Sequence, residues 1–213
     1  ITSTIDQYRS FFVWLFEKRP ILIDSGRYRY TKDAISIWQK SALGHSVPLI
    51  DGLPPICESV TSGQYVPVPY GCSKIEAMLK SHNTIRITND GFKRGGKVEK
   101  HVREITLVEN ELHVYDHFVG NGLADICLLW QYSYELEPCK ANTLEAAGGG
   151  LRMLIDIQAS IGPSRIEWLS DSIGGWFSPV YGEIKSSKVL SVSWKEYLPF
   201  ETLCIFKVEK CVV

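Results

Sequence analysis

Short apolar runs recur along the whole chain, and clusters of Gly, Pro, Asn and Asp separate them. Residues 20–24 (PILID), 84–88 (TIRIT) and 125–136 (DICLLWQYSYEL) are examples. The runs either alternate apolar and polar positions or are continuously apolar, and they are rich in β-branched and aromatic side chains. This pattern is typical of strands joined by turns, so it predicts a chain built mainly of β-strands.

The segment LVENELHVYD, residues 107–116, predicts a β-hairpin. Two alternating arms flank Glu109-Asn110, and Asn tolerates the positive φ of a tight turn. Many antiparallel strands with almost no crossover helices predict one domain over residues 1–213, an all-β antiparallel β-sandwich of layered sheets. At most one short helix is expected, within residues 72–81 (CSKIEAMLKS), where a strand followed by a loop is the alternative.

The composition excludes two classes of partner. With 45% hydrophobic residues, the 213-residue chain can bury a core. Its 23 Lys and Arg nearly balance 24 Asp and Glu, so it lacks the basic field that nucleic-acid binding uses, and no nucleic-acid partner is expected. No apolar run approaches the roughly 20 residues of a membrane helix, so no membrane partner is expected. Because the sequence begins with Ile1, we expect it to be part of a longer or processed protein.

Motifs for nucleophilic catalysis and phosphate binding are missing from the sequence. The six cysteines form no Cys-x-x-Cys pair and are interpreted as buried small hydrophobic residues, with disulfides left open. No Gly-x-Ser-x-Gly elbow occurs, and the glycine run in residues 146–151 precedes no helix with a phosphate-binding signature. A glycosidase with paired carboxylates stays open, because such pairs meet only in space.

A carboxylate and an imidazole stand at the ends of two strand-like runs. Asp24 ends the first run before a Ser25-Gly26 turn, and His45 begins the second. A carboxylate oxygen and an imidazole nitrogen are ordinary zinc ligands, and neighbouring strand ends can bring them together. The alternative is a turn-stabilising aspartate and a hydrogen-bonded histidine.

Two further groups are candidates for contact with an acidic sugar. Aromatic faces stack on sugars and guanidinium groups bind carboxylate or sulfate, which favours a first group made of Arg27, Tyr28, Arg29, Tyr30 and Trp38. Its alternative is a packed aromatic corner. His101 and Arg103 share one face of a strand and could present cations to the sugar, or could be exposed charges without a ligand. Trp176, Phe177 and Tyr181 are expected to pack in the core or in turns.

Several segments, in order, resemble the C-terminal β-sandwich region of the heparinase II/III-like proteins. This family includes polysaccharide lyases and relatives found with capsule-synthesis genes. The segments are ILIDSGRYRYT (21–31), SALGHSVPLIDG (41–52), GFKRGGKVEKHVREITLVENELHVYDHFVGNG (91–122) and GGWFSPVYGEIKSSKVL (174–190). The resemblance therefore spans most of the chain.

The resemblance implies a β-sandwich that packs against an upstream α-helical toroid, with the glycan in the cleft between them. It also implies a zinc ion held by a histidine of a His-x-His segment, the Asp of an Asp-x-Gly turn and the His of an Ala-His-Asn strand. The last two ligands fall on Asp24 and His45. His82 resembles the His-Asn-Thr motif too, but only His45 is followed by Asp51-Gly52, so His82 is assigned to a loop or strand.

The sequence departs from the family where the His-x-His segment is expected. Residues 1–11 (ITSTIDQYRSF) fill that place, so the two histidines become Thr2 and Thr4 or Ser3 and Ile5. None of these side chains binds zinc as imidazole does or moves protons near neutral pH. We therefore expect zinc to be weakly bound or absent, and no catalytic residue is assigned.

The resemblance implies β-elimination on an acidic, uronate-containing polysaccharide, in which a base removes the C5 proton and an acid protonates the leaving oxygen. In the family, a tyrosine and the group that neutralises the uronate come from the toroid, so this domain alone is expected to be inactive. The alternative is a noncatalytic carbohydrate-binding or structural module in capsule metabolism. A glycan-degrading lyase would be periplasmic or secreted, and a capsule-associated protein would be cytoplasmic.

Overall fold

The computed structural model describes residues 12–31, 33–55, 73–78, 83–140, 143–169 and 175–211. Over these ranges the chain is mostly β-strand, with one α-helix, α1 (Ala34–Lys40). Two 3-10 helices are η1 (Ala42–Gly44) and η2 (Gly91–Gly95). The strands are β1 (Trp14–Phe16), β2 (Arg19–Leu22), β3 (Pro48–Ile50), β4 (Ser73–Met78), β5 (Thr84–Asn89), β6 (Val98–Val108), β7 (Glu111–Tyr132), β8 (Glu137–Pro138), β9 (Glu145–Gly148), β10 (Leu151–Ala159), β11 (Arg165–Leu169), β12 (Trp176–Phe177), β13 (Lys185–Ser186) and β14 (Lys188–Lys210).

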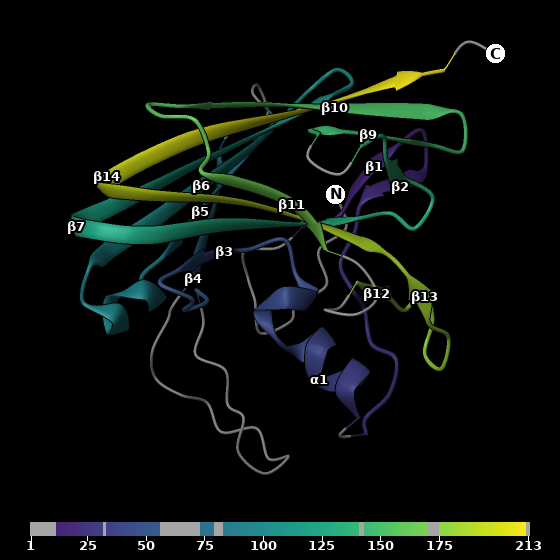
Figure 1. The fold of residues 1–213 in the computed structure, drawn as a ribbon, viewed down its shortest axis with the longest axis horizontal. Helices are drawn as coiled ribbons and strands as arrows, with labels where there is room; N and C mark the ends of the chain where they lie inside the picture. Colours follow the sequence, from purple (N-terminus) through teal and green to yellow (C-terminus); the bar gives the residue numbers. More distant parts are fainter. Residues whose placement is uncertain are drawn as a thin grey trace.

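Two long antiparallel strands, β7 and β14, form the frame of the fold. They contain 22 and 23 residues and pair with each other over almost their whole length. The pairing is interrupted only where the register shifts between Leu198 and Phe200, opposite Gly122 and Phe118. Both strands turn back on themselves at the left of Figure 1, so each contributes to two layers.

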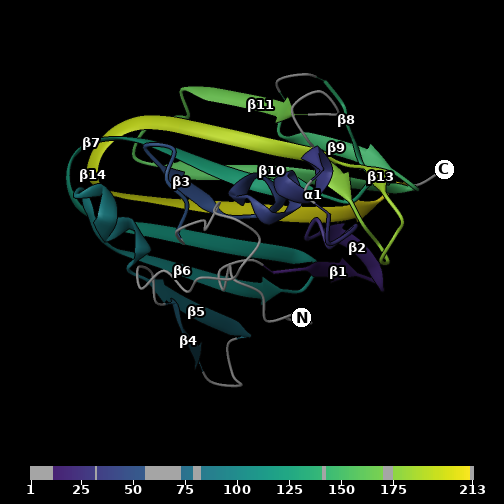
Figure 2. The same ribbon diagram turned by 90° about the horizontal axis from the view of Figure 1, so that it is seen from below.

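The two halves of β7 and of β14 pair with different strands. In the first layer, β4, β5 and β6 extend the sheet beyond β7, and β10, β9 and β8 extend it beyond β14. In the second layer, β2 and β3 pair with the end of β7, and β11 pairs with the start of β14. Figure 2 shows β5 and β4 on the side of the molecule opposite β11. This antiparallel, layered arrangement confirms the predicted all-β sandwich.

Alternating burial explains how the layers enclose one core. In the first half of β7, every second residue is buried (Leu112, Val114, Asp116 and Phe118), and the residues between them are partly exposed. The end of β7, from Leu128 to Tyr132, is buried on both faces. One face contacts the main core, and on the other Leu129 packs with Val189 against Trp38 of α1. The helix therefore covers the outer face of the second layer.

The short helix expected within residues 72–81 is not formed by residues 73–78, where the alternative of a strand is confirmed. Residues 73–78 of the expected helix form β4, which pairs residue by residue with β5. This sheet pairing overrides the local helical pattern. The observed helix begins after Asp33, whose Oδ1 accepts a hydrogen bond from the Ser36 N–H at 2.8 Å, as is typical of an N-cap residue. No helix of the described ranges is long and apolar enough to cross a membrane.

The hairpin at residues 107–116 is confirmed, because Val108 pairs with Glu111 across a two-residue turn. The positive φ of this turn, 51°, falls on Glu109 and not on Asn110, the residue that the sequence analysis singled out for it. The cysteines follow the prediction only in part. Cys204 is buried, whereas Cys139 and Cys211 are exposed, and these three and Cys127 are free thiols. Cys57 and Cys72 lie outside the described residues.

Candidate functional site

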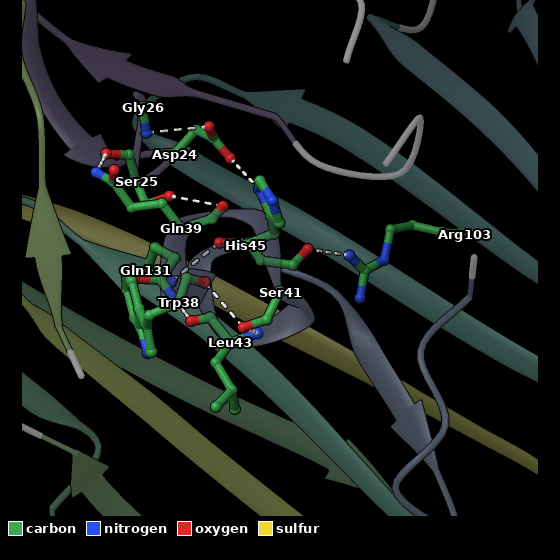
Figure 3. A network of polar contacts seen from close by, with 11 residues as sticks. Asp24, Ser25, Gly26, Trp38, Gln39, Ser41, Leu43, His45, Arg103 and Gln131 are labelled. Atoms are coloured by element: carbon green, nitrogen blue, oxygen red, sulfur yellow. Dashed lines mark hydrogen bonds and ion pairs between the residues drawn. The ribbon is translucent and has the colours of Figure 1, made fainter. Parts of the chain in front are cut away.

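The structure brings Asp24 and His45 into direct contact. Asp24 follows β2, and His45 follows η1 just before β3. Nδ1 of His45 lies 2.6 Å from Oδ1 of Asp24, so the ring donates its Nδ1 proton to the carboxylate (Figure 3). The side chains are 6% and 16% exposed, so the pair is shielded from bulk water. In this arrangement the aspartate fixes the orientation of the imidazole.

The turn after Asp24 requires a glycine. Gly26 has φ of +68°, and a Cβ atom there would lie 2.4 Å from the carbonyl oxygen of Ser178. The Gly26 N–H donates to Oδ2 of Asp24 at 3.3 Å. Ser25 donates its N–H to Gly44 O at 3.2 Å and accepts from the Ser178 N–H at 2.8 Å. The turn is therefore held between η1 and the segment that follows β12.

Buried side chains hold the loop that carries His45. Nη1 of Arg103 donates to the carbonyl oxygen of Ser46 at 2.8 Å. The Gln131 N–H donates to the Ser46 hydroxyl at 2.9 Å, and Nε2 of Gln131 donates to Leu43 O at 2.5 Å. These contacts connect the loop to β6 and β7, so the position of His45 is set by the sandwich itself.

The expectation that His101 and Arg103 face an acidic sugar is wrong. Both are buried, at 1% and 0% exposed, because the face of β6 that they share points into the molecule. Arg103 donates from Nε and Nη2 to the two oxygens of Asp116, at 2.7 and 2.9 Å. Nε2 of His101 lies 2.7 Å from Oδ1 of the same carboxylate. These three residues form a buried ionic cluster, not a sugar-contact surface.

Burial and charge shift the pKa values in this cluster. Burial lowers the pKa of His101 below its ordinary value, and the neighbouring Asp116 carboxylate opposes that shift. Burial raises the pKa of Asp116, but attraction to Arg103 and contact with His101 outweigh it and bring the value down to about 2. The cluster is therefore stable as a neutral histidine beside an Asp–Arg ion pair.

Trp38 also departs from its predicted role as a sugar-stacking residue. It is buried, and its ring meets the ring of Trp176 edge-on with centroids 5.4 Å apart. Its neighbours Leu129 and Val189 belong to β7 and β14. The helix docks on the sandwich through this side chain, so a sugar cannot stack on it.

The remaining candidates form an exposed surface. Tyr30 is 71% exposed, and the Arg27 guanidinium lies over its ring, 4.8 Å from the centroid. The Arg29 guanidinium lies 4.0 Å from the centroid of the Tyr28 ring. We call Arg27, Tyr28, Arg29, Tyr30 and Tyr181 the arginine–tyrosine surface.

Tyr181 belongs to this surface although the sequence placed it in turn packing. It is 65% exposed, and its ring centroid lies 5.8 Å from that of Tyr30. The Gly182 N–H donates to Tyr28 O at 3.0 Å, so the turn that carries Tyr181 is bonded to the first segment. The one signal in the sequence was the tyrosine before a glycine in an expected turn, which does not distinguish a packed ring from an exposed one.

In the structure, Asp24 and His45 form a hydrogen-bonded pair. A zinc site needs three or four ligands, and here the two potential ligands bind each other. Among the residues that the structure describes, no group of three or more His, Cys, Asp or Glu could hold a metal ion. The segment 1–11 and His82 lie outside those residues.

Comparison with known proteins identifies the class of protein. The family model described as "Heparinase II/III-like, C-terminal" matches residues 10–197, and the chain belongs to this family. A search of curated proteins found no match.

Two solved structures share the fold. The heparan sulfate lyase HepC from Pedobacter heparinus matches with a TM-score of 0.66 and 14% identity, over 94% of this chain and 30% of that chain. A crystal structure of heparinase III matches with a TM-score of 0.60 and 15% identity, over 92% of this chain and 28% of that chain. The chain thus spans about 30% of the length of the solved structures that it matches.

Proposed function

We propose that this domain is the glycan-facing β-sandwich of a heparinase II/III-like polysaccharide lyase and that it binds an acidic, uronate-containing glycan. The observation that carries the proposal is the arginine–tyrosine surface, which lies next to the Asp24–His45 pair in a domain of this family. Arg27 follows Asp24 by three residues, so the surface and the pair are parts of one local structure.

The chemistry of the surface suits an anionic sugar. Arg27 and Arg29 each lie over a tyrosine ring, and this contact restricts the guanidinium groups to the surface. A guanidinium group binds carboxylate or sulfate through two parallel hydrogen bonds. The exposed rings of Tyr30 and Tyr181 offer apolar faces to sugar C–H groups.

Cleavage is proposed for a longer chain and not for this domain alone. In β-elimination, a base removes the proton at C5 of the uronate, electrons form the C4–C5 double bond, and an acid protonates the leaving oxygen at C4. We propose that an upstream helical toroid supplies the acid and the group that neutralises the uronate carboxylate. The β-sandwich contributes binding and orientation of the glycan.

The full-length gene product tests the enzymatic part of the proposal. It is incubated with heparan sulfate and other acidic polysaccharides, and the ultraviolet absorbance of unsaturated uronate products is followed. We expect such products from at least one acidic glycan and none from a neutral glucan. An inert full-length protein would contradict the lyase proposal.

Calorimetric titration of the 213-residue chain tests the binding part. Replacing Arg27 and Arg29 together by Ala is expected to weaken binding of a heparan sulfate oligosaccharide at least tenfold, since two charge-assisted contacts are lost. The matched control is Arg165→Ala, because Arg165 is an exposed arginine on β11, outside the proposed surface. Equal binding by the two variants would reject this surface.

A noncatalytic carbohydrate-binding module of capsule metabolism is the second candidate. The observation that favours it is the presence of Thr and Ser where the family places the histidines of its His-x-His segment. Acidic-glycan binding together with an inert full-length protein would select this candidate.

A further inference from the structure

The buried side chain of Gln39 is bonded to the segment that carries the arginine–tyrosine surface. Gln39 lies on α1 and is 4% exposed. Its Oε1 accepts from the Tyr28 N–H at 2.8 Å, and its Nε2 donates to the Ser25 carbonyl oxygen at 2.9 Å. Both ends of one amide group are therefore used on one short segment. Figure 3 shows the contact between Gln39 and Ser25.

This segment is not part of a β-strand. Residues 25–30 make one isolated bridge, between Gly26 and Ser178. The Gln39 amide offers one acceptor and one donor to the segment, as the backbone of a neighbouring strand would. The side chain of Gln39, on α1, thus forms with this segment the two backbone hydrogen bonds that a neighbouring strand would otherwise form.

The same amide connects the surface with the Asp24–His45 pair. Ser25 directly follows Asp24, and Tyr28 belongs to the arginine–tyrosine surface. The helix that carries Gln39 leads through Ser41 into η1 and then to His45. A displacement of Gln39 would therefore move the surface relative to the pair.

We propose that Gln39 is a positioning residue that fixes the backbone of residues 25–28 and thereby sets the affinity of the arginine–tyrosine surface for an acidic glycan. The ligand in this inference rests on the proposed function. The fixing of the backbone rests on the two hydrogen bonds of the amide alone.

The first test compares Gln39→Met with Thr202→Val in the 213-residue chain. Gln39→Met keeps the length of the side chain and removes both hydrogen bonds. Thr202→Val removes one partly buried hydrogen bond, to Gln158 O on β10, and is the structural control. Calorimetric titration with a heparan sulfate oligosaccharide is expected to show affinity about tenfold weaker for Gln39→Met and unchanged for Thr202→Val.

A second readout needs no glycan. Hydrogen exchange of the Tyr28 amide is expected to be faster in Gln39→Met than in the wild type or in Thr202→Val, because this amide loses its acceptor. A variant that merely lowered global stability would speed exchange in the core strands as well. Unchanged exchange at Tyr28 in Gln39→Met would overturn the proposal.

A third variant, Gln39→Glu, is expected to bind the glycan with an affinity that depends on pH. It tests the proposal even if Gln39→Met does not fold. The protonated carboxyl group of this variant can still accept from the Tyr28 N–H and donate to Ser25 O, whereas the ionised group can only accept. Its glycan affinity relative to wild type is expected to recover as pH falls from about 8 to about 5, since the protonated form restores both bonds. A ratio that does not change with pH would contradict the role of the amide donor.

The outcomes separate this inference from the proposed function. If the wild-type chain binds no acidic glycan, the proposed function fails, and hydrogen exchange at Tyr28 still decides whether Gln39 fixes the segment. If the wild type binds and Gln39→Met binds equally well, the proposed function stands and the positioning role is rejected.

Discussion

At the scale of single residues, depth in the molecule decides what the same chemical groups do. The imidazole–carboxylate contact occurs twice, as His45–Asp24 near the surface and as His101–Asp116 in the core. The core contact is completed by Arg103, which pairs with both oxygens of Asp116. The His45–Asp24 contact is therefore available to a binding site, whereas the His101–Asp116 contact contributes to the stability of the fold.

The first prediction at this scale concerns zinc. Because Asp24 and His45 provide two ligands that bind each other, the 213-residue chain is expected to retain clearly less than one equivalent of zinc after dialysis. Elemental analysis of the wild type and of Asp24→Ala measures this. One equivalent in the wild type that is lost in Asp24→Ala would show a complete site with a further ligand.

The second prediction concerns the buried ion pair. Arg103→Met leaves the Asp116 carboxylate buried without its main partner, and we expect the free energy of unfolding to fall by about 3–5 kcal/mol. The control is Arg86→Met, which removes an arginine from a half-exposed pair with Glu104 and should cost no more than about 1 kcal/mol. Urea unfolding measures both, and equal losses would contradict the importance of burial.

At the scale of elements, the site is assembled from irregular segments that the sandwich holds in place. The Ser25–Tyr30 segment forms backbone hydrogen bonds with η1 and with the turn carrying Tyr181, and the three come from different parts of the chain. At Gly26 the first segment lies so close to Ser178, which precedes that turn, that a Cβ atom would be 2.4 Å from the Ser178 carbonyl oxygen.

Gly26→Ala is the prediction at this scale. An alanine at φ of +68° is strained, and its Cβ would lie 2.4 Å from Ser178 O, so unfolding free energy should fall by about 2–5 kcal/mol. Gly122→Ala is the control, because Gly122 also has a positive φ but a Cβ atom there would have no neighbour within 4 Å, and about 1–2 kcal/mol is expected there. Thermal unfolding of both variants measures these losses of unfolding free energy. Equal losses would contradict the importance of the close approach between Gly26 and Ser178.

Some strands and helices of the fold could be predicted from the sequence, and others could not. Alternation along β6 and β7 and the turn at Glu109-Asn110 predict the central hairpin, because both signals are local. The residues of β4 carry a helical pattern, and their strand conformation comes from pairing with β5, a contact that no local pattern contains. The short helix α1 is stabilised by packing of Trp38 on the sandwich, so it too depends on distant residues.

The candidate site was predictable to a similar extent. The approach of Asp24 to His45 and the exposure of Arg27 and Tyr30 agree with the sequence analysis. Tyr181 and Gln39 were missed, because their importance comes from contacts with a segment far away in the sequence. The burial of Arg103 was missed because its partner Asp116 lies across the sheet, on the neighbouring strand.

At the scale of the whole molecule, the buried ionic cluster links stability to pH. In the unfolded chain, His101 takes up a proton near its ordinary pKa of 6.5, whereas burial lowers its pKa in the folded state. The pKa of Asp116 is likewise lowered, from 3.8 to about 2. For each group, the unfolded state binds more protons than the folded state at pH values between the group's folded-state and unfolded-state pKa. The free energy of unfolding therefore rises with pH in that range and falls on acidification.

The fourth prediction follows from this linkage. The free energy of unfolding should decrease as pH falls below about 6.5, and further as it falls from 3.8 toward about 2. His101→Gln keeps a group that can donate to Asp116 but does not titrate, so the first decrease should become shallower, by at most about 1.4 kcal/mol per pH unit. Urea unfolding at a series of pH values measures the slopes, and identical slopes for variant and wild type would refute the assignment to His101.

The two long strands β7 and β14 also determine how the domain must fold. Their pairing joins residues far apart in the sequence, and the side chain of Asn110 donates to Val208 O across 98 positions. Because both layers contain a half of each strand, neither layer can be completed while the other is disordered. We therefore infer that the layers acquire their structure in one cooperative step, with the slow kinetics of a chain of high contact order.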